Sequence, residues 1–293
     1  MTTTTMTTTD RISQAFSVFP KHVGMLPLSG PDNLRTEFYG LFTEEGKNIG
    51  NAVKKGYRPH TVDDVLAFTQ SAISAFPDSD WTIETSWNDG HRVTVGPTHE
   101  HRRSIFGTRD AIFPRFNLNA GYDGRAFTAN LGYFRDCCLN LAEIQAISQT
   151  FAFSLRHTSN LREHMVEMID QFSHLGDKWD SLVTVAQGMQ ERQMAVSDFM
   201  REMFPAVGDA GKPGERAAKR IEAILTRIAR ERSQFGAAIG ELKTATAWEL
   251  YNGVQGYVQH DVARRGQPTN YARALLAMKD QRVKQAMSLC LAS

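Results

Sequence analysis

The chain has 293 residues, of which 41% are hydrophobic and 22% are charged, and its formal net charge at pH 7 is +1. These values are ordinary for a soluble globular protein, and the length is enough for one large domain or two modest ones. No run of about 18 apolar residues occurs, so we expect neither a membrane-spanning helix nor a membrane partner.

The cysteines and the amino terminus indicate where the protein works. The chain has three cysteines. The adjacent Cys137 and Cys138 form neither a disulfide framework nor a spaced metal pair, which favours a reducing compartment. The first ten residues, MTTTTMTTTD, contain no apolar core and therefore do not make a signal peptide. We expect a cytoplasmic protein whose residues 1–15 are a disordered leader.

The segment after the leader is rich in turn residues, and the regular elements begin beyond it. Residues 16–56 are expected to cover the core as a loop, with an extended arm or short strands as the alternative. Thr61 can cap a helix over residues 61–76, with Asp64 as its capping-box partner. Residues 81–87 and 91–95 alternate on both sides of an Asn-Asp-Gly turn, which predicts a β-hairpin.

The sheet is expected to continue through residues 105, 111–116 and 126–133, which gives an antiparallel sheet of four to five strands. From about residue 139 the apolar spacing becomes helical, with Ile144, Ile147, Phe151 and Leu155 on one stripe. Further helices are predicted over residues 161–186, 215–233, 244–265 and 271–291. The predicted class is α+β, with residues 16–160 as the core domain and residues 161–293 as a helical region.

The central segment carries an uneven charge. Residues 91–135 hold seven arginines and three acids, whereas residues 1–90 hold seven basic and eleven acidic residues. Arginines interleaved with aromatic rings are typical of a surface that binds single-stranded nucleic acid, because cations follow the phosphates and bases stack on the rings. The predicted interface consists of Arg102, Arg103, Arg109, Arg115, Arg125, Phe106, Phe113, Phe116 and Tyr122. The alternative is that these rings belong to the core and that the arginines pair with Asp110, Asp123 and Asp136.

A metal site is the second chemical hypothesis. His91, His99 and His101 lie near one another in the sequence, and the His-Glu-His order could place two imidazoles on one face of a strand. A hydrolase could use His99, His101 and Asp123 around a metal ion. No GxxxxGK[ST] loop is present, so no nucleotide cofactor is expected, and we assign no catalytic residue.

Four blocks of the sequence resemble a known family. They are Arg156–Asn160 (RHTSN), the Tyr122–Gly124 turn, Arg135–Asn140 (RDCCLN), and Thr246–Asn252 (TAWELYN) with Tyr257 and His260. Together they resemble the phage- and plasmid-like proteins of the domain of unknown function 932. The resemblance covers roughly residues 35–270. It implies a cytoplasmic protein of a mobile element, and it carries over no catalytic residue because the family has no agreed activity.

The functional expectation combines these observations. We expect a DNA-metabolism protein that binds single-stranded DNA through its central segment, for annealing or protection, without covalent chemistry. The alternative is an interaction factor that binds a host defence or replication protein through its helical half. A homo-oligomer fits either expectation.

Overall fold

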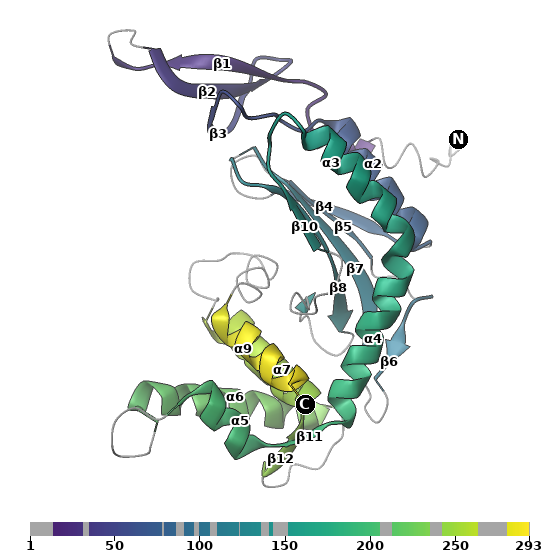
Figure 1. Cartoon of the computed structure of the whole chain (residues 1–293), viewed down its shortest axis with the longest axis vertical. Coiled ribbons are helices and arrows are strands. Elements are labelled where there is room, and N and C mark those ends of the chain that lie inside the picture. Colours follow the sequence, from purple (N-terminus) through teal and green to yellow (C-terminus); the bar gives the residue numbers. More distant parts are fainter. Residues whose placement is uncertain are drawn as a thin grey trace, which may run out of the picture. The chain divides into compact units, whose positions relative to one another are not determined.

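The structure is a computed structural model, and most of the chain can be described from it. The described residues are 14–31, 35–77, 79–85, 91–96, 100–105, 110–122, 124–135, 141–142, 152–205, 213–234, 242–262 and 280–292. Antiparallel sheets and helices are both present, which confirms the α+β class (Figure 1). Among the described residues, no helix has the length and apolar content needed to cross a membrane.

The chain forms two compact units, each built from several chain segments. The first contains Met1–His99, Arg115–Leu131 and Phe151–Gly176. The second contains Glu100–Pro114, Gly132–Thr150 and Asp177–Ser293.

A three-stranded antiparallel sheet occupies much of residues 16–56, where we expected a core-covering loop. Its strands, in spatial order, are β1 (Val23–Ser29), β2 (Arg35–Thr43) and β3 (Asn48–Lys54). The loop prediction was wrong because the turn residues fall where strands tolerate them. Pro27 lies in the edge strand β1, where a missing N–H breaks no central ladder. Gly46 and Gly50 have positive φ angles of 79° and 64° and form a turn and an irregularity in β3.

One face of this small sheet is anchored by the turn that contains Tyr122. Tyr122 joins a buried apolar cluster with Leu41, Ile49, Val53 and Tyr57. The backbone of Gly50 approaches the Tyr122 carbonyl so closely that any side chain at position 50 would overlap it. The neighbouring Asn51 N–H donates to the same carbonyl at 3.0 Å.

The first predicted helix and hairpin are confirmed. Helix α2 (Val62–Ala75) follows Thr61, whose backbone N–H donates to the Asp64 carboxylate at 2.7 Å. Strands β4 (Trp81–Thr85) and β5 (His91–Val95) pair antiparallel.

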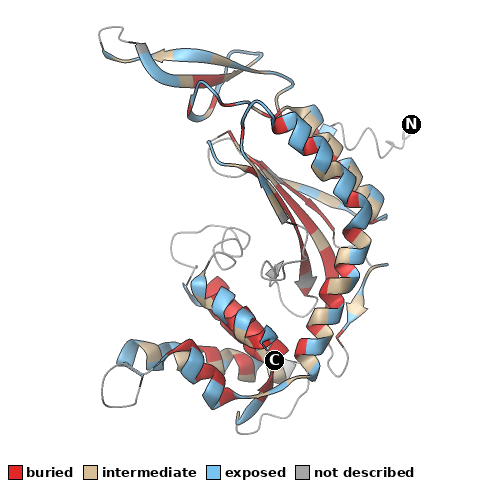
Figure 2. Ribbon diagram, in the orientation of Figure 1, coloured by how far each residue is buried: buried red, intermediate tan, exposed pale blue. Residues whose placement is uncertain are grey.

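The larger sheet has seven strands, five of them in the order β10-β8-β7-β5-β4. Strand β7 (Ala111–Ala120) is central, and nearly all of its residues are buried (Figure 2). Strand β8 (Phe127–Arg135) follows it. Two short strands, β6 (Arg103–Ser104) and β9 (Leu141–Ala142), pair with β7 and β8.

The helix predicted from the stripe that ends at Leu155 is wrong at its carboxyl end. Ala152–Leu155 is strand β10, which pairs antiparallel with β8. A few apolar residues cannot distinguish a short strand from a buried helix, and here the pairing with β8 decides. Ile144, Ile147 and Phe151 lie outside the described residues.

Helices dominate the rest of the described chain. They are α3 (Leu161–Asp170), α4 (Leu175–Glu191), α5 (Val196–Met203), α6 (Glu215–Gln234), α7 (Ala247–Tyr257) and α9 (Gln281–Leu291). Helices α3, α4, α6 and α7 lie near predicted ranges, α5 was not predicted, and α9 covers the described part of the helix predicted over residues 271–291. The predicted helix over residues 244–265 begins late, because β12 (Thr244–Thr246) pairs with β11 (Gln193–Ala195) and Thr246 then caps α7. The helix over 244–265 also changes character at its end, where Val258–Val262 is a π-helix, η4.

Helix α7 is packed closely against α6. A Cβ atom on Gly253 of α7 would overlap the Ile228 side chain of α6, and Ile224 and Ile228 are fully buried. The absence of a side chain at position 253 therefore sets how closely these two helices approach.

A buried ion pair ties α7 to the sheet within the second unit. The Arg135 guanidinium, at the end of β8, lies 2.7 Å from Asp110 Oδ2, and both side chains are 1% exposed. The Trp248 indole N–H donates to the same carboxylate oxygen at 3.1 Å. The guanidinium also lies over the Trp248 ring, 5.6 Å from its centroid. One carboxylate thus connects β8, the start of β7 and the start of α7.

We predict that Asp110→Asn lowers the free energy of unfolding by about 3–5 kcal/mol, because it leaves a guanidinium buried without its counter-charge. The control is Asp180→Asn, which removes a carboxylate 3.7 Å from Arg103 on the surface and should cost less than about 1 kcal/mol. Urea unfolding followed by circular dichroism measures both. Equal costs would show that the Asp110 pair is not a central support.

We predict that Gly253→Ala destabilises the protein by about 1–3 kcal/mol, because the added methyl group must push Ile228 and α6 away. The matched change is Gly188→Ala in α4, where an added Cβ meets nothing within 4 Å. That change should stabilise the helix by roughly 0.5–1 kcal/mol. Thermal unfolding of the two variants should therefore shift in opposite directions.

Candidate nucleic-acid interface

Three of the four aromatic rings of the predicted central interface are buried. Phe113, Phe116 and Tyr122 are 3%, 1% and 1% exposed. Phe113 and Phe116 belong to the central strand β7, and Tyr122 packs under the small sheet. A buried ring offers no face to a base, so these three positions supply no stacking surface in this fold. Phe106 and Arg109 lie outside the described residues.

The arginines of the same segment have different environments. Arg102 is exposed, with its guanidinium 5.9 Å from the Phe113 ring centroid, and the neighbouring Arg103 is half-buried. Both belong to the second unit, whereas Arg115 and Arg125 belong to the first. Arg115 is half-buried and donates to Thr94 Oγ1 at 3.5 Å, and Arg125 is exposed.

Two of the histidines proposed as metal ligands belong to different units. His91 is buried in the first unit, with its ring edge-on to Phe19 at 4.7 Å. His101 belongs to the second unit, and its carbonyl accepts from the Trp179 indole N–H at 3.1 Å. His99 and Asp123 lie outside the described residues. Within the described part of the chain, no group of three or more His, Cys, Asp or Glu side chains is arranged to hold a metal ion.

The structure presents a different basic surface on helix α6. Arg216, Lys219, Arg220 and Arg230 are exposed, and Arg227 is half-buried. Successive members are three, one, seven and three residues apart, which places all five within about 100° of one side of a helix with 3.6 residues per turn. The stripe from residue 216 to residue 230 is about 21 Å long, at 1.5 Å per residue. We call these five residues the α6 stripe.

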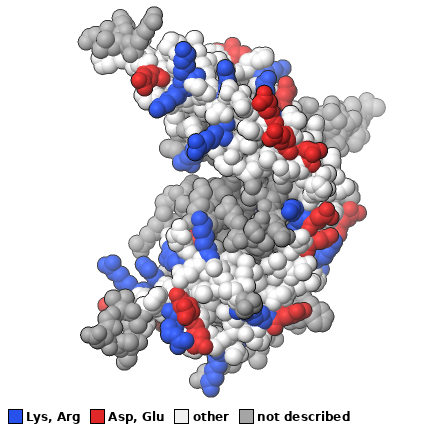
Figure 3. Space-filling model, viewed as in Figure 1, with Lys and Arg blue, Asp and Glu red and all other residues white. Residues whose placement is uncertain are grey.

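The packing of α6 explains why this side faces outward. Ile224 and Ile228 are turned toward α7, where Gly253 receives Ile228. Arg232 is also on the packed side, and it donates to both carboxylate oxygens of Glu249 at 2.8 and 2.7 Å. Ile224 and Ile228 pack against α7, whereas Arg216, Lys219, Arg220 and Arg230 are exposed. Arg227 instead reaches Asp261 in η4, which continues α7. Lys and Arg side chains, with acidic ones among them, are visible over this part of the second unit in Figure 3.

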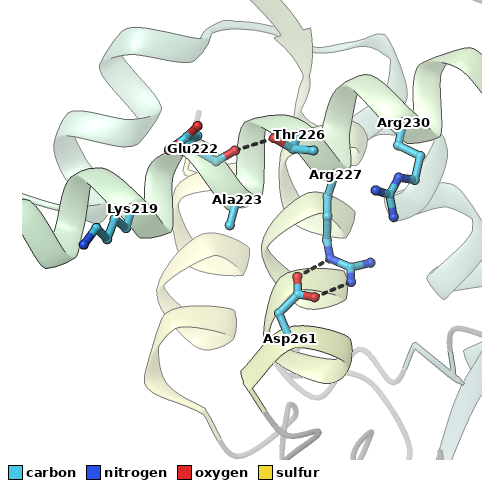
Figure 4. Close-up of a pocket in the computed structure, with 7 residues that line it drawn as sticks. All are labelled: Lys219, Glu222, Ala223, Thr226, Arg227, Arg230 and Asp261. Carbon is cyan, nitrogen blue, oxygen red and sulfur yellow. Dashed lines mark hydrogen bonds and ion pairs between the residues drawn. The ribbon is translucent and has the colours of Figure 1, made fainter.

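A hollow of about 310 Å³ lies along the stripe (Figure 4). Its lining consists of Lys219, Glu222, Ala223, Thr226, Arg227, Arg230 and Asp261. Asp261, from the π-helix η4, accepts two hydrogen bonds from Arg227 at 2.7 and 2.9 Å. These hydrogen bonds hold the pKa of the Asp261 carboxyl below its usual value, so the carboxylate stays charged.

The arrangement suits phosphate groups better than it suits chemistry on a bound substrate. The hollow combines three cations with two carboxylates and one hydroxyl, and it is open to solvent. Long cationic side chains on an exposed helix contact phosphates without fixing a base sequence. The signal was present in the sequence as cations at helical spacing, but the sequence-based prediction followed only the apolar stripe of this helix.

A buried imidazole in the first unit has no partner for its charged form. His60 is fully buried, and neither of its ring nitrogens has a hydrogen-bond partner among the residues that the structure describes. Its ring stacks on Tyr122 with centroids 4.3 Å apart. Desolvation holds the pKa of His60 well below its usual value, and the nearby His157 and His91 lower it further. His60 therefore acts as a neutral core ring.

Comparisons with known proteins give a family but no activity. The family model described as Domain of unknown function (DUF932) matches residues 51–287. No curated protein and no solved structure matches the chain.

We predict that the protein loses stability as the pH falls below about 6.5, because His60 takes up a proton only in the unfolded chain. The stability contributed by the neutral His60 is fully present above the pKa that this histidine has in the unfolded chain. Below that pKa, the free energy of unfolding falls by up to about 1.4 kcal/mol for each pH unit. His60→Phe keeps a ring stacked on Tyr122 but cannot take up a proton, so its free energy of unfolding should change less with pH. His164→Gln, at an exposed site on α3, should leave the pH dependence unchanged. Urea unfolding between pH 5 and pH 8 tests both, and a His60→Phe profile equal to the wild-type one would contradict the assignment.

Proposed function

The chain belongs to the DUF932 family, and we propose that it binds single-stranded nucleic acid through the α6 stripe. The bound strand would be annealed or protected, without covalent chemistry. We further propose that it does so in the cytoplasm, as a protein of a phage- or plasmid-type element. The observation that carries this proposal is the row of Arg216, Lys219, Arg220, Arg227 and Arg230 along one side of a packed helix.

Charge supports the choice of a polyanion. Helix α6 holds six basic and three acidic residues in a protein whose net charge is only +1. Of the six, Arg232 is bound to Glu249 on the packed side and Arg227 to Asp261 of η4, and Lys219 donates to Glu215 of its own helix at 2.8 Å. The helix keeps a basic excess of three after its own acids are counted. A polyanion releases its counterions when such a row neutralises its phosphates, and this release makes binding both favourable and dependent on salt.

The geometry supports contact with several phosphates at once. The stripe is about 21 Å long, which is the length of roughly six nucleotides of one strand at about 3.4 Å each. Flexible lysine and arginine side chains can follow a strand whose path is irregular. Arg102 and Arg103 in the second unit, and Arg115 in the first, remain alternative places for such contacts.

We predict that changing Arg216, Lys219 and Arg230 together to Gln weakens binding to a labelled single-stranded oligonucleotide. The slope of log K against log salt should decrease by about 2, at roughly 0.7 for each lost phosphate contact. Glutamine is a good helix former and keeps the length of the side chains. Fluorescence anisotropy at 50, 100 and 200 mM salt measures the slope.

Two matched variants decide where the strand binds. Changing Arg162, Arg201 and Lys284 to Gln removes three exposed cations from helices α3, α5 and α9 and should alter the slope little. Changing Arg102, Arg103 and Arg115 to Ala tests the central segment. A loss confined to the last variant would move the interface there. A wild-type protein that binds no oligonucleotide at 50 mM salt would overturn the proposed function.

A further inference from the structure

We propose that the outer face of the small β1–β2–β3 sheet is a base-stacking site for unpaired nucleotides, centred on Phe38 and Phe42. This inference rests on the proposed function and extends it to a second surface, in the first unit. It explains how a protein that holds phosphates could also distinguish a single strand from a duplex.

The two faces of the small sheet differ in what covers them. The inner face, with Leu41, Ile49 and Val53, packs on Tyr122. Side chains alternate between faces along a strand, so Phe38, Gly40 and Phe42 share the opposite face of β2. On β1, Leu26 lies directly opposite Gly40 and is 57% exposed.

The two phenylalanine rings are free to accept another ring. Phe38 is 45% exposed and Phe42 is half-buried. Across the residues that the structure describes, neither ring contacts another aromatic ring. Gly40 lies between them, and a Cβ atom there would come within 2.9 Å of Phe42 Cε2. The Phe42 ring therefore lies along the strand over Gly40, where the Leu28 side chain also comes close, and this position keeps the ring near the sheet.

The charge on this face fits a nucleotide better than an apolar protein partner. Lys54 lies directly opposite Phe38 in the pairing of β2 with β3, so its exposed side chain is on the same face. Glu44, at the end of β2, is occupied by the backbone N–H groups of Lys21 and His22 at 3.4 and 3.3 Å. An exposed ring beside an exposed ammonium group can hold a base and its phosphate together.

The Cα atoms of the two phenylalanines are far enough apart for each residue to meet its own base. Residues 38 and 42 are four positions apart on one strand, which corresponds to about 13 Å at roughly 3.3 Å per residue. Bases of a duplex are stacked on each other and cannot reach such rings. The face therefore selects unpaired nucleotides without reading their sequence.

The experiment compares variants of Phe38 that distinguish the effect of an aromatic ring from the effect of apolar surface area. Phe38→Leu keeps an apolar side chain and removes the ring, and Phe38→Tyr keeps the ring. We expect Phe38→Leu to weaken binding to an oligo-dT strand by roughly 5- to 150-fold, as for one lost base stack. Phe38→Tyr should bind within about twofold of wild type. Binding to a duplex of the same length should change little in either variant.

A tryptophan at the same position supplies an independent signal. Phe38→Trp places an indole on the outer face, and its fluorescence should be quenched when oligo-dT is added. Val166→Ala, at a 69% exposed apolar site on α3, is the control for loss of exposed apolar area and should leave affinity unchanged. Circular dichroism and thermal unfolding confirm that each variant is folded.

The outcomes separate this inference from the proposed function. If the α6 variant loses affinity while Phe38→Leu binds oligo-dT as wild type does, the stacking site is overturned and the phosphate-binding function stands. If Phe38→Leu lowers the molar mass measured by light scattering and leaves affinity unchanged, the face joins copies of the chain and the inference fails. If the wild type binds neither oligo-dT nor duplex, both proposals fail.

Discussion

Complete burial of helix α7 is the constraint on which the second unit depends. Every residue of Ala247–Tyr257 except Glu249 is buried, so each side of the helix must be covered by another element. Trp248 meets the Asp110–Arg135 pair, Gly253 receives Ile228 of α6, and the Ala247 carbonyl accepts from Cys290 of α9. A helix buried all round cannot present a binding surface. The surfaces of this unit are therefore left to the helices that cover it.

In the first unit, the small sheet likewise has one face packed against other residues and one face exposed to solvent. Tyr122 and its turn occupy the inner face of the small sheet, and the close approach at Gly50 leaves no freedom in that contact. The outer face then keeps Leu26 and Phe38 in solvent. Helix α6 and the β1–β2–β3 sheet each pack against their unit by one face. The residues on which the functional proposals depend lie on the opposite face.

Local patterns allowed much of the fold to be predicted. The Thr61–Asp64 capping box, the hairpin of β4 and β5, and the spacing of α3, α4 and α6 involve residues close in sequence, and these elements are found near the predicted positions. Contacts between residues far apart in the sequence could not be predicted from such local patterns. Asp110 is 25 residues from Arg135 and 138 from Trp248, and the need for glycine at position 253 depends on Ile228 in another helix.

The predicted interface shows the same limit. Alternating rings and arginines look alike in sequence whether the rings face a core or a ligand. The central strand β7 is covered on both faces, which buries Phe113 and Phe116. The cations of α6 and the rings of β2 lay outside the segment that composition singled out. The exposure of a ring, and not its residue type, decides whether it belongs to the core or can contact a ligand.

The π-helix at the end of α7 has a consequence for how tightly the second unit can hold an anion. The wider turn of the π-helix carries Asp261, whose two carboxylate oxygens accept hydrogen bonds from Arg227. Under the proposed function, a phosphate in the hollow would compete with this carboxylate for Arg227, which is half-buried, whereas Lys219 and Arg230 are exposed. Binding as proposed would then depend on the exposed side chains, each of which can dissociate from the ligand separately, and such a surface would favour rapid exchange of the ligand over long residence.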